Sequence, residues 1–187
     1  YFAGYGYKDI TYAVGASPAA AVRGLELCCR TGANVKFLID TLEQADALGE
    51  AGQKTGITPS AFIELDVDDH RGGLKPVADR MKAAGVELAG VLSHAGESYA
   101  LNTREALLAA AENERAATVQ AAELLRARGH ACPIVSIGST PTAHFAENLD
   151  GVTEVRAGVY MFFDLVQHGV GVCAIDDLAI SVLATVV

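Results

Sequence analysis

The sequence predicts an α/β fold built on parallel strands. Short strand-like segments alternate with amphipathic helical segments along most of the 187 residues, which is typical of a parallel sheet covered by helices. The strand-like segments are almost continuously apolar, which indicates burial on both faces. A doubly wound open sheet and a TIM-type barrel both fit this pattern. The absence of GxGxxG after the first strand disfavours a dinucleotide-binding fold.

Local signals mark where the elements begin and end. The expected strands are 9–14, 35–40, 61–67, 88–94, 133–138 and 153–158. Ser17 before Pro18 suits the start of a helix, because serine caps helices and proline fits the first helical position. Thr41 and Gln44 have the spacing of a capping box.

Two further helices connect the later strands. One is expected over 74–84, ended by Gly85, and a long one over 103–128, with Asn102 as the cap and Gly129 as the stop. The β-rich run 178–187 follows without a clear helix before it. We interpret it as the first strand of a second domain, which divides the chain into 1–175 and 176–187.

Composition excludes several classes of function. The net charge of -9 opposes nucleic-acid and anionic-membrane partners, which require basic patches. With 51% hydrophobic residues the chain can bury a core. The cysteines Cys28, Cys29, Cys132 and Cys173 have no CxxC spacing, so we expect buried free thiols. No secretion signal and no membrane-spanning apolar run is recognised, so a cytoplasmic protein is expected.

Polar, glycine-containing loops follow four of the expected strands. They cover residues 66–73, 93–99, 136–142 and 156–160. Ligand sites of parallel α/β folds form at the carboxyl ends of the strands, so these loops are the candidate site.

Two of the loops suit a phosphate group. Ser139 and Thr140 offer hydroxyls and backbone N–H donors before a possible short helix, although an ordinary capped turn has the same sequence. Gly158 and Val159 would let the backbone approach a ligand, or simply end a strand.

The side chains around these loops each have a functional and an ordinary interpretation. His94 offers a flat ring for stacking on a planar ligand, or a structural hydrogen bond. Arg71 suits an anion or phenolate, or a surface ion pair of small value. Arg156, expected mid-strand, favours function because a buried arginine needs partners. Tyr99 and Tyr160 suit hydrogen bonding or acid–base work, or packing.

No metal site is predicted within the chain. The acidic residues before Arg71, together with His70, match neither an EF-hand loop nor an HExxH motif, so a solvated turn is expected.

Taken together, the loop motifs resemble the D-threonine aldolase / D-serine dehydratase family of alanine-racemase-like, fold type III enzymes, which use pyridoxal 5'-phosphate (PLP). The motifs are Ile63–Val67 with His70-Arg71, Leu92–Gly96 with Ser98-Tyr99, Val135–Thr142, and Glu154–Tyr160. Their order and spacing cover nearly the whole chain.

The resemblance implies a PLP site at the mouth of an eight-stranded barrel. It implies that Arg71 contacts the phenolic oxygen, that His94 stacks on the pyridine ring, and that Arg156 lies near the ring nitrogen. It places Tyr99 at an active-site tyrosine position, as the catalytic candidate. The remaining cofactor-binding candidates are Ser139, Thr140, Gly158, Val159 and Tyr160.

The resemblance also implies that parts of the family's machinery lie elsewhere. The Schiff-base lysine of the family ends the first barrel strand, and no lysine of this chain has that context. We therefore expect an incomplete barrel with six of eight strands, inactive as a fragment. The family's divalent metal is held by the C-terminal β domain, so its ligands are expected outside the chain. A homodimer is expected for the whole protein.

The expected function is that of a PLP-dependent lyase acting on D-β-hydroxy amino acids. Aldol cleavage and dehydration both remain open. An alanine-racemase-like racemase and a non-catalytic PLP-binding protein are the alternatives.

Overall fold

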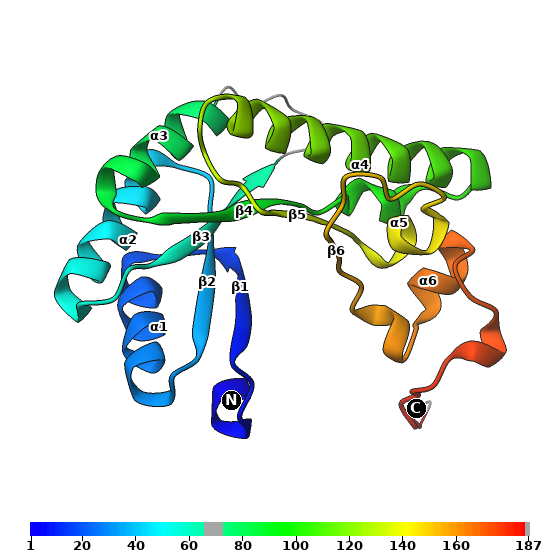
Figure 1. Ribbon diagram of the computed structural model, residues 1–187. Helices are drawn as coiled ribbons and strands as arrows, with labels where there is room; N and C mark the ends of the chain where they lie inside the picture. Colours follow the sequence, from blue (N-terminus) through cyan, green and yellow to red (C-terminus); the bar gives the residue numbers. More distant parts are fainter. Residues whose placement is uncertain (66–72, 186–187) are drawn as a thin grey trace.

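Six parallel strands form one curled sheet in which every strand pairs with its neighbours in the sequence (Figure 1). The computed structural model describes residues 1–65 and 73–185. The strands are β1 (Asp9–Gly15), β2 (Asn34–Ile39), β3 (Ser60–Leu65), β4 (Glu87–Ser93), β5 (Ile134–Ile137) and β6 (Glu154–Val155). A doubly wound sheet would reverse its strand order partway. The sequential order, with the strands curling toward one another, is instead that of a half-barrel of the TIM type.

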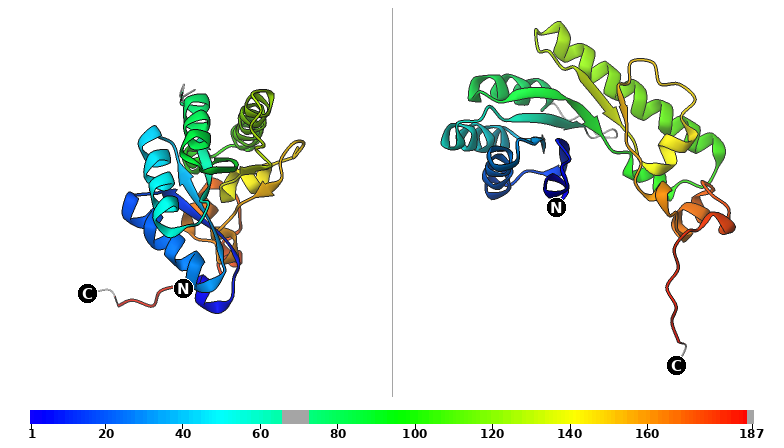
Figure 2. Two further views of the ribbon diagram at one scale, coloured as in Figure 1. Left: turned by 60° about the vertical axis from the view of Figure 1, so that its left-hand side comes forward. Right: turned by 60° about the horizontal axis from the view of Figure 1, so that its bottom comes forward.

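The long helices cover the convex face of this sheet (Figures 1 and 2). The helices are α1 (Pro18–Thr31), α2 (Leu42–Thr55), α3 (Leu74–Ala84), α4 (Arg104–Ala127), α5 (Thr140–Phe145) and α6 (Leu165–Val170). Short 3-10 turns are η1 (Phe2–Tyr5), η2 (Gly96–Ala100), η3 (Val159–Met161) and η4 (Ile175–Asp177). None of the helices in the described parts of the chain is long and apolar enough to cross a membrane.

The predicted helix caps form, with one correction. Ser17 Oγ accepts a hydrogen bond from Ala20 N (3.2 Å), and Thr41 and Gln44 make both bonds of the capping box. The expected cap of α4, Asn102, is wrong. Thr103 caps the helix instead, because its side chain accepts from Ala106 N, three residues ahead.

The end of the chain differs from the expected strands in two places. The sixth strand is only Glu154–Val155, so Arg156 lies just past the strand and not within it. Residues 178–185 pair with no strand among the described residues and run away from the sheet (Figure 2). A strand requires a partner, so the assignment of 176–187 to a second domain stays a prediction.

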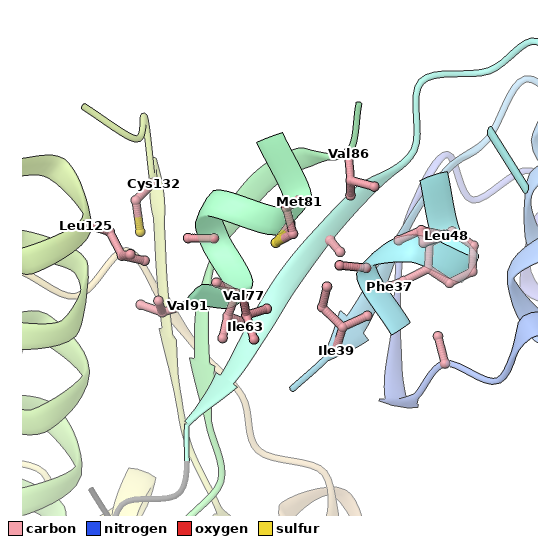
Figure 3. Packing of buried hydrophobic residues seen from close by; sticks show 14 of the residues in the cluster. Phe37, Ile39, Leu48, Ile63, Val77, Met81, Val86, Val91, Leu125 and Cys132 are labelled. Carbon is pink, nitrogen blue, oxygen red and sulfur yellow. The ribbon is translucent and has the colours of Figure 1, made fainter. Parts of the chain in front are cut away.

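Alternating strand residues pack on the two faces of the sheet. Phe37, Ile39, Ile63 and Val91 point toward the helices, where they meet residues such as Met81 (Figure 3). A smaller apolar cluster lies on the concave face: Leu38, Phe62, Ala89 and Leu92. Both faces are thus buried near the sheet centre, as the continuous apolar strands predict.

All four cysteines are free thiols, as expected, but they are not all buried. Cys132 is buried, Cys28 and Cys173 are half-buried, and Cys29 is exposed. The expected burial is wrong for Cys29, which lies near the carboxyl end of the amphipathic helix α1, on its solvent side.

A close contact between β4 and β5 generates a prediction about stability. Gly90 lies at a register shift in β4, and a Cβ atom there would come within 2.0 Å of the Ile134 backbone oxygen. Because backbone must move, Gly90→Ala in the full-length protein should lower the free energy of unfolding by about 1–3 kcal/mol. Gly169→Ala, where a Cβ meets nothing within 4 Å, is the matched control. Equal denaturant midpoints for the two variants would contradict the close approach.

Candidate active site

The loops after β4, β5 and β6 meet at the carboxyl edge of the sheet, as the sequence predicts. Hydrogen bonds link the loop after β4 to the loop after β5, and Arg156, just past β6, bonds to both of those strands. The loop that contains Arg71 lies outside the described residues, as do Asp66, Asp68, Asp69 and His70.

His94 is held in one orientation by the loop after β5. Its Nδ1 lies 3.0 Å from the Gly138 carbonyl oxygen. A carbonyl only accepts, so Nδ1 carries the proton, and Nε2 is the acceptor nitrogen of the neutral ring. The ring of Tyr99 lies 6.3 Å from the His94 ring, centroid to centroid. His94 itself is exposed at the residue level, which leaves its ring accessible to a ligand.

Gly138 must be glycine for this approach to exist. Its φ is 134°, and a Cβ atom would come within 2.1 Å of the Arg156 backbone oxygen. A side chain at this position would therefore push the loops after β5 and β6 apart.

Ser139 and Thr140, two neighbouring candidates, differ in what their hydroxyls do. Ser139 Oγ accepts from Thr142 N (3.3 Å) as the cap of α5 and lies 2.9 Å from Ser98 Oγ. Thr140 Oγ1 is buried and has no hydrogen-bond partner among the described residues. Buried hydroxyls are nearly always satisfied. Thr140 is therefore the better candidate to bind a ligand oxygen, and Ser139 the one that shapes the loop.

Arg156 is anchored on the concave side of the sheet. Its Nε donates to Ser136 Oγ (2.8 Å) and its Nη2 donates to the Ser93 carbonyl oxygen. Burial lowers the pKa of Arg156 from its usual value, while the negative charges of Glu114, Glu154 and Glu64 act in the opposite direction. The guanidinium is thus oriented by neutral acceptors and compensated by surrounding carboxylates.

The residues after Arg156 leave space at the surface. Gly158 precedes η3, and a Cβ atom added to it would meet nothing within 4 Å. Its φ of -116° suits any residue, so no contact within the described chain requires glycine here. Tyr160 is 57% exposed. Among the described residues no side-chain contact links Gly158, Val159 or Tyr160 to the other candidates, so their role in cofactor binding stays a prediction.

Glu114 on α4 is a site residue that the sequence analysis missed. Its carboxylate is fully buried and accepts hydrogen bonds from four residues. Ser93, Ala95 and Gly138 lie at the ends of β4 and β5 or just beyond, and Thr142 lies in α5. The sequence did contain a signal that could have identified Glu114. The buried positions of α4 form a helical stripe of mostly apolar residues, and a glutamate within such a stripe needs a buried partner.

Gln167 on α6 was missed as well. Its side-chain amide is buried, and neither the oxygen nor the nitrogen has a partner among the described residues. Helix α6 packs against η2 and α5, the two short helices of the site loops. A buried water or a ligand atom would satisfy this amide.

The described residues contain no group of three or more His, Cys, Asp or Glu side chains placed to hold a metal ion. The site instead combines an oriented imidazole, a buried hydroxyl without a partner, and an anchored guanidinium. Such a set suits a planar ligand that carries an anionic group.

Comparison with known proteins identifies the family of this chain. The model of the family "Alanine racemase, N-terminal domain" matches residues 12–166. D-threo-3-hydroxyaspartate dehydratase from Delftia sp. (strain HT23) is 50% identical over 190 residues, 97% of this chain and 50% of that protein. D-serine dehydratase from Dictyostelium discoideum is 28% identical, over 97% of this chain and 50% of the relative. D-threonine aldolase from Arthrobacter sp is 27% identical, over 71% of this chain and 37% of the relative.

A solved structure of the Delftia sp. HT23 dehydratase superimposes with a TM-score of 0.90 at 48% identity, over 95% of this chain and 49% of that one. A variant of that dehydratase has also been solved in what is described as its metal-free form. The chain spans about half the length of the two dehydratases from Delftia sp. and Dictyostelium discoideum. With the family model covering most of its length, the chain belongs to the alanine racemase N-terminal domain family.

Proposed function

We propose that this chain forms most of the PLP-binding half-barrel of a lyase that acts on D-β-hydroxy amino acids. One observation carries the proposal. The buried hydroxyl of Thr140, which has no hydrogen-bond partner among the described residues, lies at the start of α5, two residues after Gly138, whose carbonyl holds the His94 ring. A site for PLP needs both an oxygen-binding pocket for the phosphate and a flat surface for the ring.

The residues fit this cofactor on chemical grounds. Thr140 would donate its free hydroxyl to a phosphate oxygen, and Ser139 would shape the loop around it. His94 would lie against one face of the ring, because its Nδ1 bond to Gly138 holds the imidazole in place. Arg156 would lie on the nitrogen side of the ring. Gly158, Val159 and Tyr160 would complete the phosphate side, and Arg71 would bind the phenolic oxygen.

When bound, PLP withdraws electrons from the α-carbon of an amino acid. The protein's part is to orient the substrate, exclude water and move protons. Tyr99, whose ring lies near that of His94, is our candidate to hold or transfer a proton through its hydroxyl oxygen. Lys36 on β2 is paired with Asp9 on β1, so we do not assign it as the lysine that carries the cofactor.

Among the lyase reactions we favour dehydration of a D-3-hydroxy amino acid. The support is the 50% identity to D-threo-3-hydroxyaspartate dehydratase, against 27% to D-threonine aldolase. A divalent metal, held outside this chain, and a homodimer are parts of the same proposal. The described residues offer no metal-binding cluster, so we assign the metal no ligand here.

The proposed reaction can be tested by product analysis. The full-length protein, loaded with PLP and a divalent metal, should convert D-threo-3-hydroxyaspartate to oxaloacetate and ammonia, because loss of water followed by hydrolysis gives a 2-oxo acid. The L-enantiomer is the control and should give no product. Glycine and an aldehyde as products would move the enzyme to the aldolases, and inverted substrate without a carbonyl product would make it a racemase. PLP binding without any turnover would support a non-catalytic protein.

The role of Thr140 can be tested with two substitutions in the full-length protein. Thr140→Val keeps the shape and removes the hydroxyl, and should raise the dissociation constant for PLP at least about tenfold, since one hydrogen bond to a charged group contributes about 1.5 kcal/mol or more. Thr140→Ser keeps the hydroxyl and should bind within a few-fold of wild type.

Thr55→Val is the matched control, because that hydroxyl bonds to the Ala51 carbonyl within α2, away from the site. Titration of the cofactor-free protein with PLP, followed by absorbance, measures all three. Wild-type affinity in Thr140→Val would remove Thr140 from the phosphate site.

A further inference from the structure

A buried carboxylate joins the two loops of the candidate site. Glu114 Oε1 accepts hydrogen bonds from Ser93 Oγ (3.1 Å), Ala95 N (3.2 Å) and Gly138 N (3.0 Å). Its other oxygen, Oε2, accepts from Thr142 Oγ1 (2.7 Å). Both oxygens act as acceptors, which suits an ionised carboxylate.

This arrangement has a specific cause in the backbone. Ala95 and Gly138 come just after the ends of β4 and β5, so Glu114 takes the place of a strand partner for both N–H groups. A buried charge without donors is strongly unfavourable, and so is a buried N–H without an acceptor. The two needs are met together only when the loops lie at a fixed distance from α4.

The same loops are also linked by hydrogen bonds that do not involve the Glu114 carboxylate. His94 Nδ1 bonds to the Gly138 carbonyl, so the Gly138 residue is held by Glu114 through its N–H and by His94 through its oxygen. Ser98 and Ser139 add a contact between their hydroxyls at 2.9 Å. The loops after β4 and β5 are therefore tied to each other and to α4 by hydrogen bonds.

We propose that Glu114 is a positioning residue that sets the spacing between His94, which faces the cofactor ring, and Thr140, which faces the phosphate. It reaches the first loop through Ser93 and Ala95, and the second through Gly138 and Thr142. The proposal rests on the function proposed above. It predicts that loss of the hydrogen bonds between Glu114 and one of the loops weakens PLP binding, although Glu114 would not itself contact the cofactor.

Ser93 extends this network to the guanidinium of Arg156. The Ser93 hydroxyl donates to Glu114 and its carbonyl accepts from Arg156 Nη2. The negative charge of Glu114 favours the charged form of that arginine. Glu114 thus influences three of the proposed cofactor contacts at once.

The test uses three variants of the full-length protein and PLP as the probe. Glu114→Ala removes the hydrogen bonds to both loops and should raise the dissociation constant for PLP at least about tenfold, which corresponds to 1.4 kcal/mol. Glu114→Gln keeps one oxygen for the three donors to Oε1 and should bind PLP within about threefold of wild type. Glu123→Gln, on the exposed side of the same helix, is the matched control and should bind as wild type does.

A fourth variant, Thr142→Val, covers the case in which Glu114→Ala does not fold. Thr142→Val removes the bond to Glu114 Oε2 and leaves the carboxylate with its three other donors. It also removes the capping-box bond from Ser139 N to Thr142 Oγ1 (3.1 Å) at the start of α5. It should weaken PLP binding about three- to tenfold and speed hydrogen exchange in residues 138–145. Thr142 touches no proposed cofactor atom, so a role limited to stability would lower the melting temperature and leave the affinity of the folded protein unchanged.

The outcomes separate the two proposals. Wild-type affinity in Thr142→Val, or in a folded Glu114→Ala, overturns the positioning role and leaves the proposed function standing. Absence of PLP binding by the wild-type protein overturns the proposed function. In that case unchanged hydrogen exchange of residues 94–100 and 138–145 in the variants would also remove the structural basis of the positioning role.

Discussion

The hydrogen bonds to the Glu114 carboxylate are the interaction on which the arrangement of the site depends. The strands β4 and β5 pair only from Gly90 to Leu92 and from Ile134 to Ser136, so the sheet ladder ends before the loops begin. Beyond that point no backbone ladder determines how the loops lie. A single buried carboxylate takes over this task, because it can accept several hydrogen bonds at once and becomes unfavourable if any loop moves away.

The fold around the site follows from simpler constraints, and most of it could be predicted from the sequence. The apolar strands, the Ser17–Pro18 helix start and the Thr41–Gln44 capping box are local signals, and each appears in the structure. The sequential strand order could not be read from the apolar pattern alone, since an open sheet has the same pattern. It is a property of which strands pair, and those contacts lie far apart in the chain.

The sequence predicts which residues lie at the site better than it predicts what each side chain does there, because that depends on its hydrogen-bond partners. His94 and the 138–142 loop could be placed at the edge from strand ends alone. Ser139 and Thr140 look equivalent in sequence, yet the cap of α5 and Ser98 occupy one hydroxyl and leave the other without a partner. Asn102 was predicted as the cap of α4 and Thr103 is the cap observed. Asparagine and threonine both cap helices well, so the sequence alone does not decide between two such neighbours. Glu114 lies about 20 residues from each loop that it holds, so no local signal connects them.

Glu114 on α4 ties together the loops after β4 and β5. One of these loops carries the oriented ring of His94, the other leads into Thr140, and Arg156 is anchored to β4 and β5. The proposed position of the cofactor relative to these groups can be measured in a crystal structure of the full-length protein with PLP. We expect a phosphate oxygen within hydrogen-bond distance of Thr140 Oγ1 and the pyridine ring against the imidazole of His94. A cofactor bound elsewhere, with the Thr140 hydroxyl satisfied by another protein group, would contradict it.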